Sequence, residues 1–136
     1  MLTLPIRPSF YDLDFGGVAN NIAYLRWMED ARSHLINDSP LPLARLTELR
    51  TLPVVRRTLV NYHAPLCVGE EAVLEVELAD LGRSAWTFTF RFIRTSDGAL
   101  LASGSQYGCF VHLDRRRPVP IPESIREHML AVLRNE

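Results

Sequence analysis

Two long segments of the sequence alternate between apolar and polar residues, and this pattern constrains the fold most strongly. Over residues 71–79, apolar side chains occupy one face and glutamates the other. Over residues 85–93, the same alternation gathers four aromatic side chains on one face: Trp86, Phe88, Phe90 and Phe92. A period of two is typical of strands with one buried face, so both segments are predicted to be long antiparallel strands.

Three other segments favour strands because they are rich in β-branched and aromatic residues, and they span 3–12, 54–63 and 99–113. The first is interrupted by Pro5 and Pro8, which suit an edge strand or an irregular one. The last contains Gly104 and Gly108, where a bulge or close packing is expected. The sequence therefore predicts an initial strand and, later in the chain, three or four long antiparallel strands.

One long helix is predicted between the first strand and the others, over residues 21–36. Its apolar stripe recurs at helical spacing and consists of Tyr24, Met28, Ala31 and Leu35. Asn20 suits the N-cap, and the NDSP sequence at 37–40 ends the helical pattern. Shorter helices are expected at 42–49 and 123–134.

A single long helix cannot cover both faces of a sheet whose strands exceed the usual length of about five or six residues. We therefore predict an α+β architecture in which a curved antiparallel sheet wraps around a central helix. Neither an internal repeat nor a linker divides the sequence, so residues 1–136 are predicted to form this one domain.

The composition argues against several classes of function. A net charge of −1 provides no field for nucleic acid, and no apolar run approaches the roughly 20 residues of a membrane span. The first residues lack the features of a secretory signal, and Cys67 and Cys109 form no CxxC pair, so a cytoplasmic protein is expected. The four histidines are not spaced like metal ligands, so neither a metal nor a bound cofactor is expected.

The segment DLDFGGVANN, residues 12–21, joins the first strand to the long helix and is the strongest candidate for an active site. It places Asp12 and Asp14 before two glycines and the helix start. A carboxylate can act as a nucleophile or a general base, and the unpaired N–H groups of a helix start can stabilise an oxyanion. The alternative is an ordinary connection in which the acids cap or pair locally.

A pattern of nine residues runs from this loop into the helix: Asp12, Asp14, Gly17, Asn20, Asn21, Tyr24, Glu29, Ala31 and Arg32. It resembles the hotdog-fold acyl-CoA thioesterases of the 4-hydroxybenzoyl-CoA thioesterase type. The similarity continues through NYHAPLCVGEEAVLEVEL and DGALLASGSQYGCFVHLDRRRPVPIP, so it covers essentially the whole chain. The resemblance implies the hotdog fold and hydrolysis of an acyl-CoA thioester to a carboxylic acid and coenzyme A, without a metal or cofactor.

The resemblance assigns the chemistry to two groups. Asp14 is the acid that faces the thioester carbonyl and either attacks it or activates a water, and the backbone N–H of Asn21 binds the oxyanion. Gly16 and Gly17 let the chain bend and let the substrate approach the backbone. Val18 replaces a histidine that many members carry, which argues against a histidine-dependent mechanism but not against thioester hydrolysis.

Four further residues are candidates for substrate binding. Tyr24 lies on the apolar stripe and is expected in the core or the pocket wall. His63 lies on a strand near the expected cleft, although a structural role is the simpler interpretation. Arg83 is the first choice among the arginines for coenzyme A phosphates. Glu29 either pairs with Arg32 or reaches the site of a neighbouring subunit.

The resemblance also implies how the protein assembles and what it binds. An obligatory homodimer with shared active sites is expected, with the sheet continuous across it, and two dimers are expected to form a tetramer. The substrate is an acyl-CoA or an acyl carrier protein. Two alternatives stay open: a non-catalytic acyl-CoA or carrier-protein binding module, and an (R)-specific enoyl-CoA hydratase of the same fold, which usually uses an acid and a histidine together.

Overall fold

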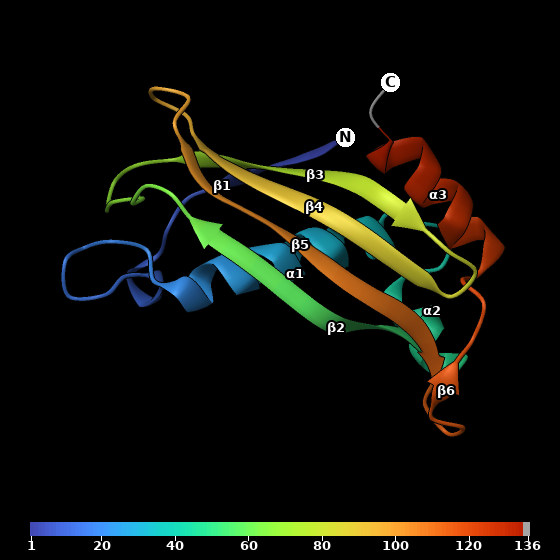
Figure 1. Ribbon diagram of the computed structural model, residues 1–136. Coiled ribbons are helices and arrows are strands. Elements are labelled where there is room, and N and C mark those ends of the chain that lie inside the picture. The colour runs from blue at the N-terminus through green and yellow to red at the C-terminus, as the bar shows by residue number, and fades with distance from the viewer. Residues whose placement is uncertain (135–136) are drawn as a thin grey trace.

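In the computed structural model, which describes residues 1–134, an antiparallel sheet curves around one long helix (Figure 1). The strands are β1 (Leu2–Ile6), β2 (Thr51–Tyr62), β3 (Ala72–Leu81), β4 (Ala85–Arg94), β5 (Leu100–His112) and β6 (Arg117–Pro118). The helices are α1 (Asn21–Asn37), α2 (Leu43–Glu48) and α3 (Glu123–Leu133), and the 3-10 turn η1 covers Phe10–Asp12.

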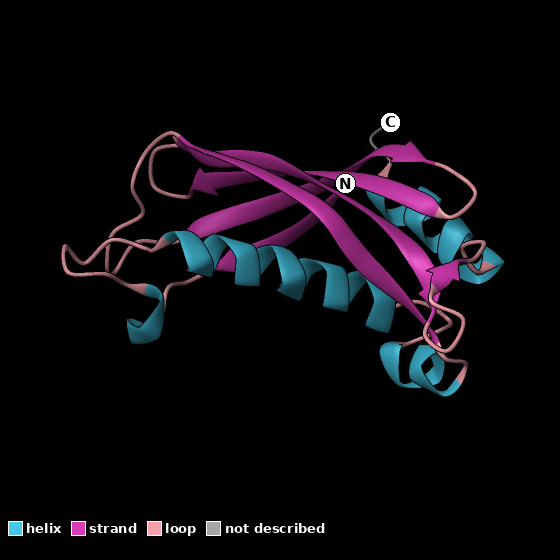
Figure 2. Cartoon of the chain, turned by 60° about the horizontal axis from the view of Figure 1, so that its bottom comes forward, coloured by secondary structure: helices cyan, strands magenta, loops and turns pink. Residues whose placement is uncertain are grey.

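The strands follow the order β1-β3-β4-β5-β2, and β6 pairs with the end of β5. Every pairing is antiparallel. In this order β1 and β2 form the two edges of the main sheet. Figure 2 shows α1 running along the concave side of the curved sheet. The predicted α+β architecture, a curved antiparallel sheet around a long central helix, is confirmed.

The helix α1 begins and packs as its sequence indicates. The Asn20 side chain accepts the Ala23 N–H at 2.9 Å, which confirms the predicted N-cap. The buried face of α1 lies against the aromatic face of β4, and the rings of Tyr24 and Phe92 meet edge to face at 5.0 Å between their centroids. Because buried aromatic side chains dominate core energetics, this contact fixes how α1 sits on the sheet.

The first strand is shorter than predicted. It ends at Ile6, and residues 10–12 form η1 instead of continuing the strand to residue 12. Pro8 has no N–H to donate to a ladder, so the chain leaves the sheet before it. Pro5 remains inside β1, which is compatible with an edge strand.

The two glycines of β5 lie where neighbouring atoms approach the backbone closely. A Cβ atom at Gly104 would overlap the carbonyl oxygen of Leu59 on β2, and one at Gly108 would overlap the Trp86 ring. Of the two predicted reasons for these glycines, the structure shows close packing. The register shift in the β2–β5 pairing lies on β2, between Val55 and Arg57.

Candidate active site

The loop that precedes α1 is held in place from two sides. The Asp14 N–H donates to the Val18 carbonyl oxygen at 2.9 Å and closes a turn. Gly17 and Ala19 pair with the segment 66–68, which follows β2, through two backbone hydrogen bonds of 2.8 Å. Gly17 has a φ of +70°, a left-handed conformation that favours glycine. The loop is therefore a built element with a defined shape.

The two aspartates of this loop have different surroundings. Asp12 is buried, accepts the Ser9 N–H at 2.8 Å and forms an ion pair with Arg26. Asp14 is exposed, and its Oδ1 accepts the Gly16 N–H at 3.1 Å. Asp12 therefore pairs locally, whereas the Asp14 carboxylate is oriented by one backbone amide and accessible from outside.

A cavity of 400 Å³ lies at the N-terminal end of α1. It brings together five of the predicted site residues: Asp14, Val18, Asn21, Tyr24 and His63. Asn21 is the first residue of α1, so its amide has no acceptor within the helix. The Asn20 cap accepts the Ala23 N–H instead. The cavity thus combines an exposed carboxylate with the positive end of the helix dipole. We call it the Asp14 cavity.

The end of β2 forms the opposite wall of the Asp14 cavity. The Tyr62 hydroxyl donates to the Asn21 carbonyl oxygen at 3.4 Å, and its ring meets that of Tyr24 edge to face at 5.3 Å between centroids. Burial, followed by the nearby Tyr62, raises the pKa of Tyr24 to about 12. The Tyr24 phenol therefore stays neutral to a higher pH than an exposed tyrosine.

His63 reaches this wall with a partner of its own. Its Nε2 lies 2.8 Å from the Ser103 Oγ, and its backbone N–H donates to the Leu101 carbonyl oxygen at 2.8 Å. Sequence reasoning did not single out Tyr62 or Ser103 as site residues. The place of Ser103 depends on how β2 pairs with β5, and that of Tyr62 on how α1 packs against the end of β2. The local signal for Tyr62 was that it immediately precedes His63.

Four predicted site residues do not line the Asp14 cavity of their own subunit. Gly16 and Gly17 belong to the loop beside it, whereas Glu29 and Arg83 lie elsewhere. Glu29 lies farther along α1 and forms the expected ion pair with Arg32, at 3.9 Å. Arg83 lies between β3 and β4, where its carbonyl oxygen accepts a hydrogen bond from Arg126 of α3 at 3.1 Å. Figure 1 places this turn at the opposite end of the sheet from the start of α1. A role for Glu29 or Arg83 at Asp14 requires a second subunit and stays a prediction.

The possible metal ligands, the cysteines and the helix lengths bear on other kinds of site within residues 1–134. Within this part of the chain, His, Cys, Asp and Glu form no group of three placed to hold a metal ion. Cys67 and Cys109 are free thiols. The helices described here include none that combines the length and the apolar character of a membrane span.

A curved antiparallel sheet around one long helix is the hotdog fold. The sequence profile of the thioesterase-like superfamily matches residues 8–129, and the chain belongs to this superfamily. These observations confirm the resemblance found in the sequence.

Individual relatives agree with this membership. The acyl-CoA thioester hydrolase YbgC of Escherichia coli is 26% identical over 121 residues, which cover 89% of this chain and 90% of YbgC. A 1,4-dihydroxy-2-naphthoyl-CoA thioesterase from Synechocystis superposes with a TM-score of 0.86 at 15% identity and covers 93% of each chain. A Staphylococcus aureus protein solved in complex with CoA gives a TM-score of 0.89 at 14% identity, over 98% of this chain and 86% of its own.

Proposed function

We propose that this protein hydrolyses acyl-CoA thioesters to a carboxylic acid and coenzyme A, with Asp14 as the catalytic carboxylate. One observation carries the proposal: Asp14 and the Asn21 end of α1 border the same cavity of 400 Å³. Thioester hydrolysis needs an activated oxygen nucleophile and donors for the oxyanion, and this cavity offers both. The YbgC relative and the CoA-bound structural neighbour support coenzyme A as the thiol.

The proposed reaction places the thioester carbonyl oxygen at the Asn21 N–H. Asp14 then takes a proton from a water that attacks the carbonyl carbon, the C–S bond breaks, and the leaving thiolate receives the proton. In the alternative route Asp14 attacks the carbonyl carbon, the C–S bond breaks and the coenzyme A thiolate leaves; water then hydrolyses the anhydride, which restores the Asp14 carboxylate and supplies the proton that the thiolate takes up. Both routes consume one water and release one carboxylic acid, and neither uses a metal or a bound cofactor.

The remaining residues of the cavity are assigned to substrate contact. Gly16 and Gly17 keep the loop beside Asp14 free of side chains, and Val18 and Tyr24 line the cavity. Val18 stands where many family members carry a histidine. The imidazole in this cavity comes instead from His63, at the end of β2, where Ser103 orients it.

We expect the purified protein to release free thiol from at least one member of a panel of short, long and aromatic acyl-CoAs. An acyl carrier protein thioester belongs in the same panel, and a thiol-reactive dye measures the release. Measurable ligand binding with no release above background would favour the binding module. Hydration of an enoyl-CoA without thiol release would favour the hydratase.

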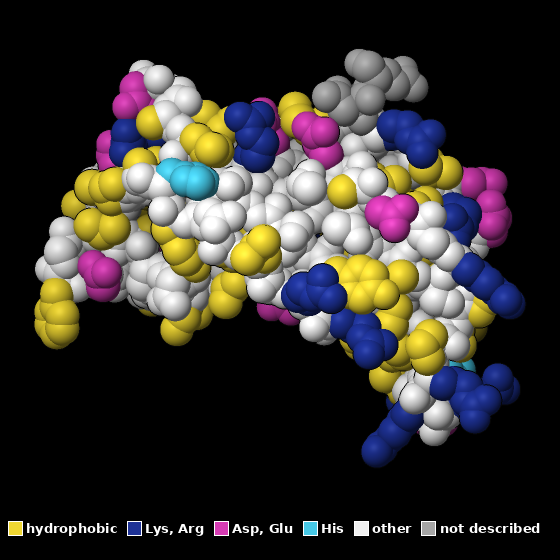
Figure 3. Space-filling model, viewed as in Figure 1, with side chains coloured by type: hydrophobic (Ala, Val, Ile, Leu, Met, Phe, Trp, Pro, Cys, Tyr) yellow, Lys and Arg dark blue, Asp and Glu magenta, His cyan; other side chains and the backbone are white. Residues whose placement is uncertain are grey.

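The proposal includes a cytoplasmic homodimer that shares its active sites and associates further into a tetramer. β2 supports it, because this twelve-residue strand is an edge of the sheet and leaves ladder groups unpaired within residues 1–134. Leu59 and Tyr62 on β2 are 55% and 51% exposed. Hydrophobic side chains also gather where α1 begins (Figure 3), and the exposed ones there include Phe10, Phe15, Ile22 and Val68.

Light scattering is expected to give two or four times the 15.5 kDa mass of one chain. Leu59→Lys places a charge at an exposed position of the edge strand β2. It is expected to shift the protein to a species of lower mass with lower thiol release. Leu49→Lys, at an exposed site after α2, is the matched control and should leave the mass unchanged. A wild-type protein that is monomeric and fully active would contradict the shared site.

A further inference from the structure

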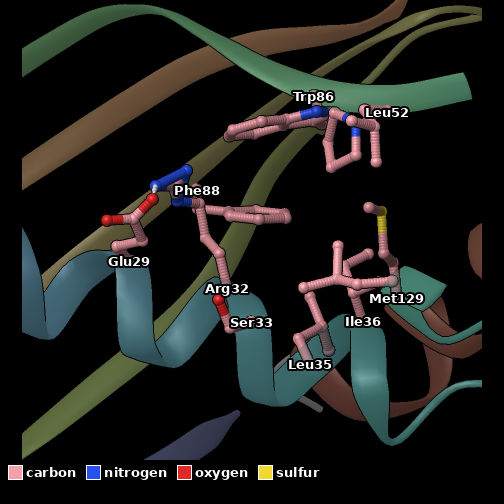
Figure 4. A pocket seen from close by; sticks show the side chains of 11 residues that line it. Glu29, Arg32, Ser33, Leu35, Ile36, Leu52, Trp86, Phe88 and Met129 are labelled. Carbon is pink, nitrogen blue, oxygen red and sulfur yellow. Dashed lines mark ion pairs between the residues drawn. The ribbon is translucent and has the colours of Figure 1, made fainter. Parts of the chain in front are cut away.

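A second cavity, of 180 Å³, lies beside the C-terminal half of α1 (Figure 4). Its apolar lining comes from five elements and includes Leu35, Ile36, Leu52, Trp86, Phe88 and Met129. Its polar lining comes from one turn of α1: Glu29, Arg32 and Ser33. An apolar cavity of about 150 Å³ can accept a benzene ring, so this cavity has room for a group of that size. We call it the Arg32 cavity.

Arg32 borders this cavity as a poorly paired cation. Its Nε is shielded from solvent and has no hydrogen-bond partner within residues 1–134. Glu29 lies 3.9 Å from Nη2, which is longer than a hydrogen bond, and the Glu29 side chain is 69% exposed. Burial lowers the pKa of Arg32, and Glu29 opposes this shift. Because a buried charged donor without an acceptor is unfavourable, the site favours a ligand that brings an anionic oxygen.

Trp86 and Phe88 provide the surface for the rest of such a ligand. Their rings stack at 4.5 Å between centroids with an interplanar angle of 23°, and both side chains are buried. The Trp86 Nε1 is a second buried donor that has no acceptor within the described chain. A carboxylate on a compact apolar body matches this lining, because its oxygens suit the N–H donors and its body suits the aromatic wall.

The Arg32 cavity is distant from the Asp14 cavity within one subunit. Asn21 and Arg32 lie eleven residues apart on α1, which corresponds to about 16 Å of helix. A group of ring size at Arg32 therefore cannot also reach the Asn21 amide of the same subunit. The group in the Arg32 cavity therefore belongs to one of two molecules. It is either a free carboxylic acid or the carboxylate end of an acyl group whose thioester lies in the Asp14 cavity of another subunit.

We propose that the Arg32 cavity binds a small organic carboxylate, with Arg32 holding the carboxylate and Trp86 and Phe88 covering its apolar body. A carboxylic acid is also what the proposed thioesterase reaction releases. Binding of a free acid does not require that activity, so the two proposals can fail separately.

Titration calorimetry on the full chain with sodium benzoate tests the site directly. Benzoate is expected to bind in the millimolar range or tighter, and benzyl alcohol, of similar size but uncharged, at least tenfold more weakly. Arg32→Met keeps the apolar stem, removes the charge and should weaken benzoate binding at least tenfold. Trp86→Phe removes the second donor and should weaken it less. Arg91→Met, an exposed arginine on β4, is the matched control and should leave binding unchanged.

Equal affinity for benzoate and benzyl alcohol, or benzoate binding unaffected by Arg32→Met, would overturn the proposal; so would the absence of benzoate binding to wild type. The inhibition pattern separates the two sources. Benzoate that competes with an acyl-CoA, together with an Arg32-dependent preference for glutaryl-CoA over pentanoyl-CoA, identifies the end of an acyl group. Benzoate binding without competition identifies a free acid. Either pattern supports the site.

Discussion

Asp14→Asn is expected to lower kcat/KM for acyl-CoA hydrolysis by about 10² to 10⁴-fold, the usual contribution of a positioned acid–base group. The asparagine can still accept the Gly16 N–H through its Oδ1, so the loop should keep its shape. It can neither take a proton from water nor attack a carbonyl. The effect should therefore appear in turnover and not in folding, and steady-state thiol release with a parallel thermal melt measures both.

Two further variants make the Asp14 result specific. Asp80→Asn removes an equivalent charge from an exposed position at the end of β3 and should leave kcat/KM unchanged. Asp12→Asn weakens the partly buried pair with Arg26 and should lower stability more than Asp14→Asn does. Near-wild-type turnover in a folded Asp14→Asn protein would remove Asp14 from the mechanism.

Much of the fold follows from local patterns in the sequence. The alternation over 71–79 and 85–93 predicted β3 and β4, and helical periodicity with Asn20 as cap predicted α1. These signals are local because an amphipathic element repeats its pattern at its own period. The end of β1 was predicted wrongly. Pro5 and Pro8 were both interpreted as compatible with an edge strand or an irregular one, but only Pro5 lies within the strand, which ends at Ile6. The strand order depends on contacts between distant residues, and no local pattern encodes it.

The candidate site also has one part that the sequence could predict and one part that it could not. The loop, the exposed Asp14 and the first amides of α1 are adjacent in sequence, so their proximity could be predicted. The contacts of Tyr62 with Asn21 and of His63 with Ser103 join residues about forty positions apart. The second depends on the β2–β5 register and the first on how α1 packs against the sheet. The Arg32 cavity was also missed. The i, i+3 spacing predicted the pairing of Arg32 with Glu29, but it could not predict that Trp86 and Met129 would enclose one side of that turn.

Gly104→Ala is expected to destabilise the protein by about 3 kcal/mol or more, at or above the top of the usual range for overpacking. Its new Cβ would overlap the Leu59 carbonyl oxygen, which belongs to the backbone of β2 and cannot turn away as a side chain could. Relief requires β2 to move away from β5. That movement would break the ladder between Leu59 and Ser105 and between Val60 and Gly104, just before the strand end that carries Tyr62.

Gly82→Ala is the matched control for this substitution. A Cβ at Gly82 would meet its nearest atom, the Ala85 carbonyl oxygen, at an ordinary contact distance of 3.6 Å. Its urea midpoint should equal or slightly exceed that of wild type, because alanine restricts the unfolded chain. If Gly104→Ala unfolds at the same urea concentration as Gly82→Ala, the close approach of β2 to β5 is wrong. The placement of Tyr62 and His63 opposite Asp14 depends on that approach, so this result would contradict it as well.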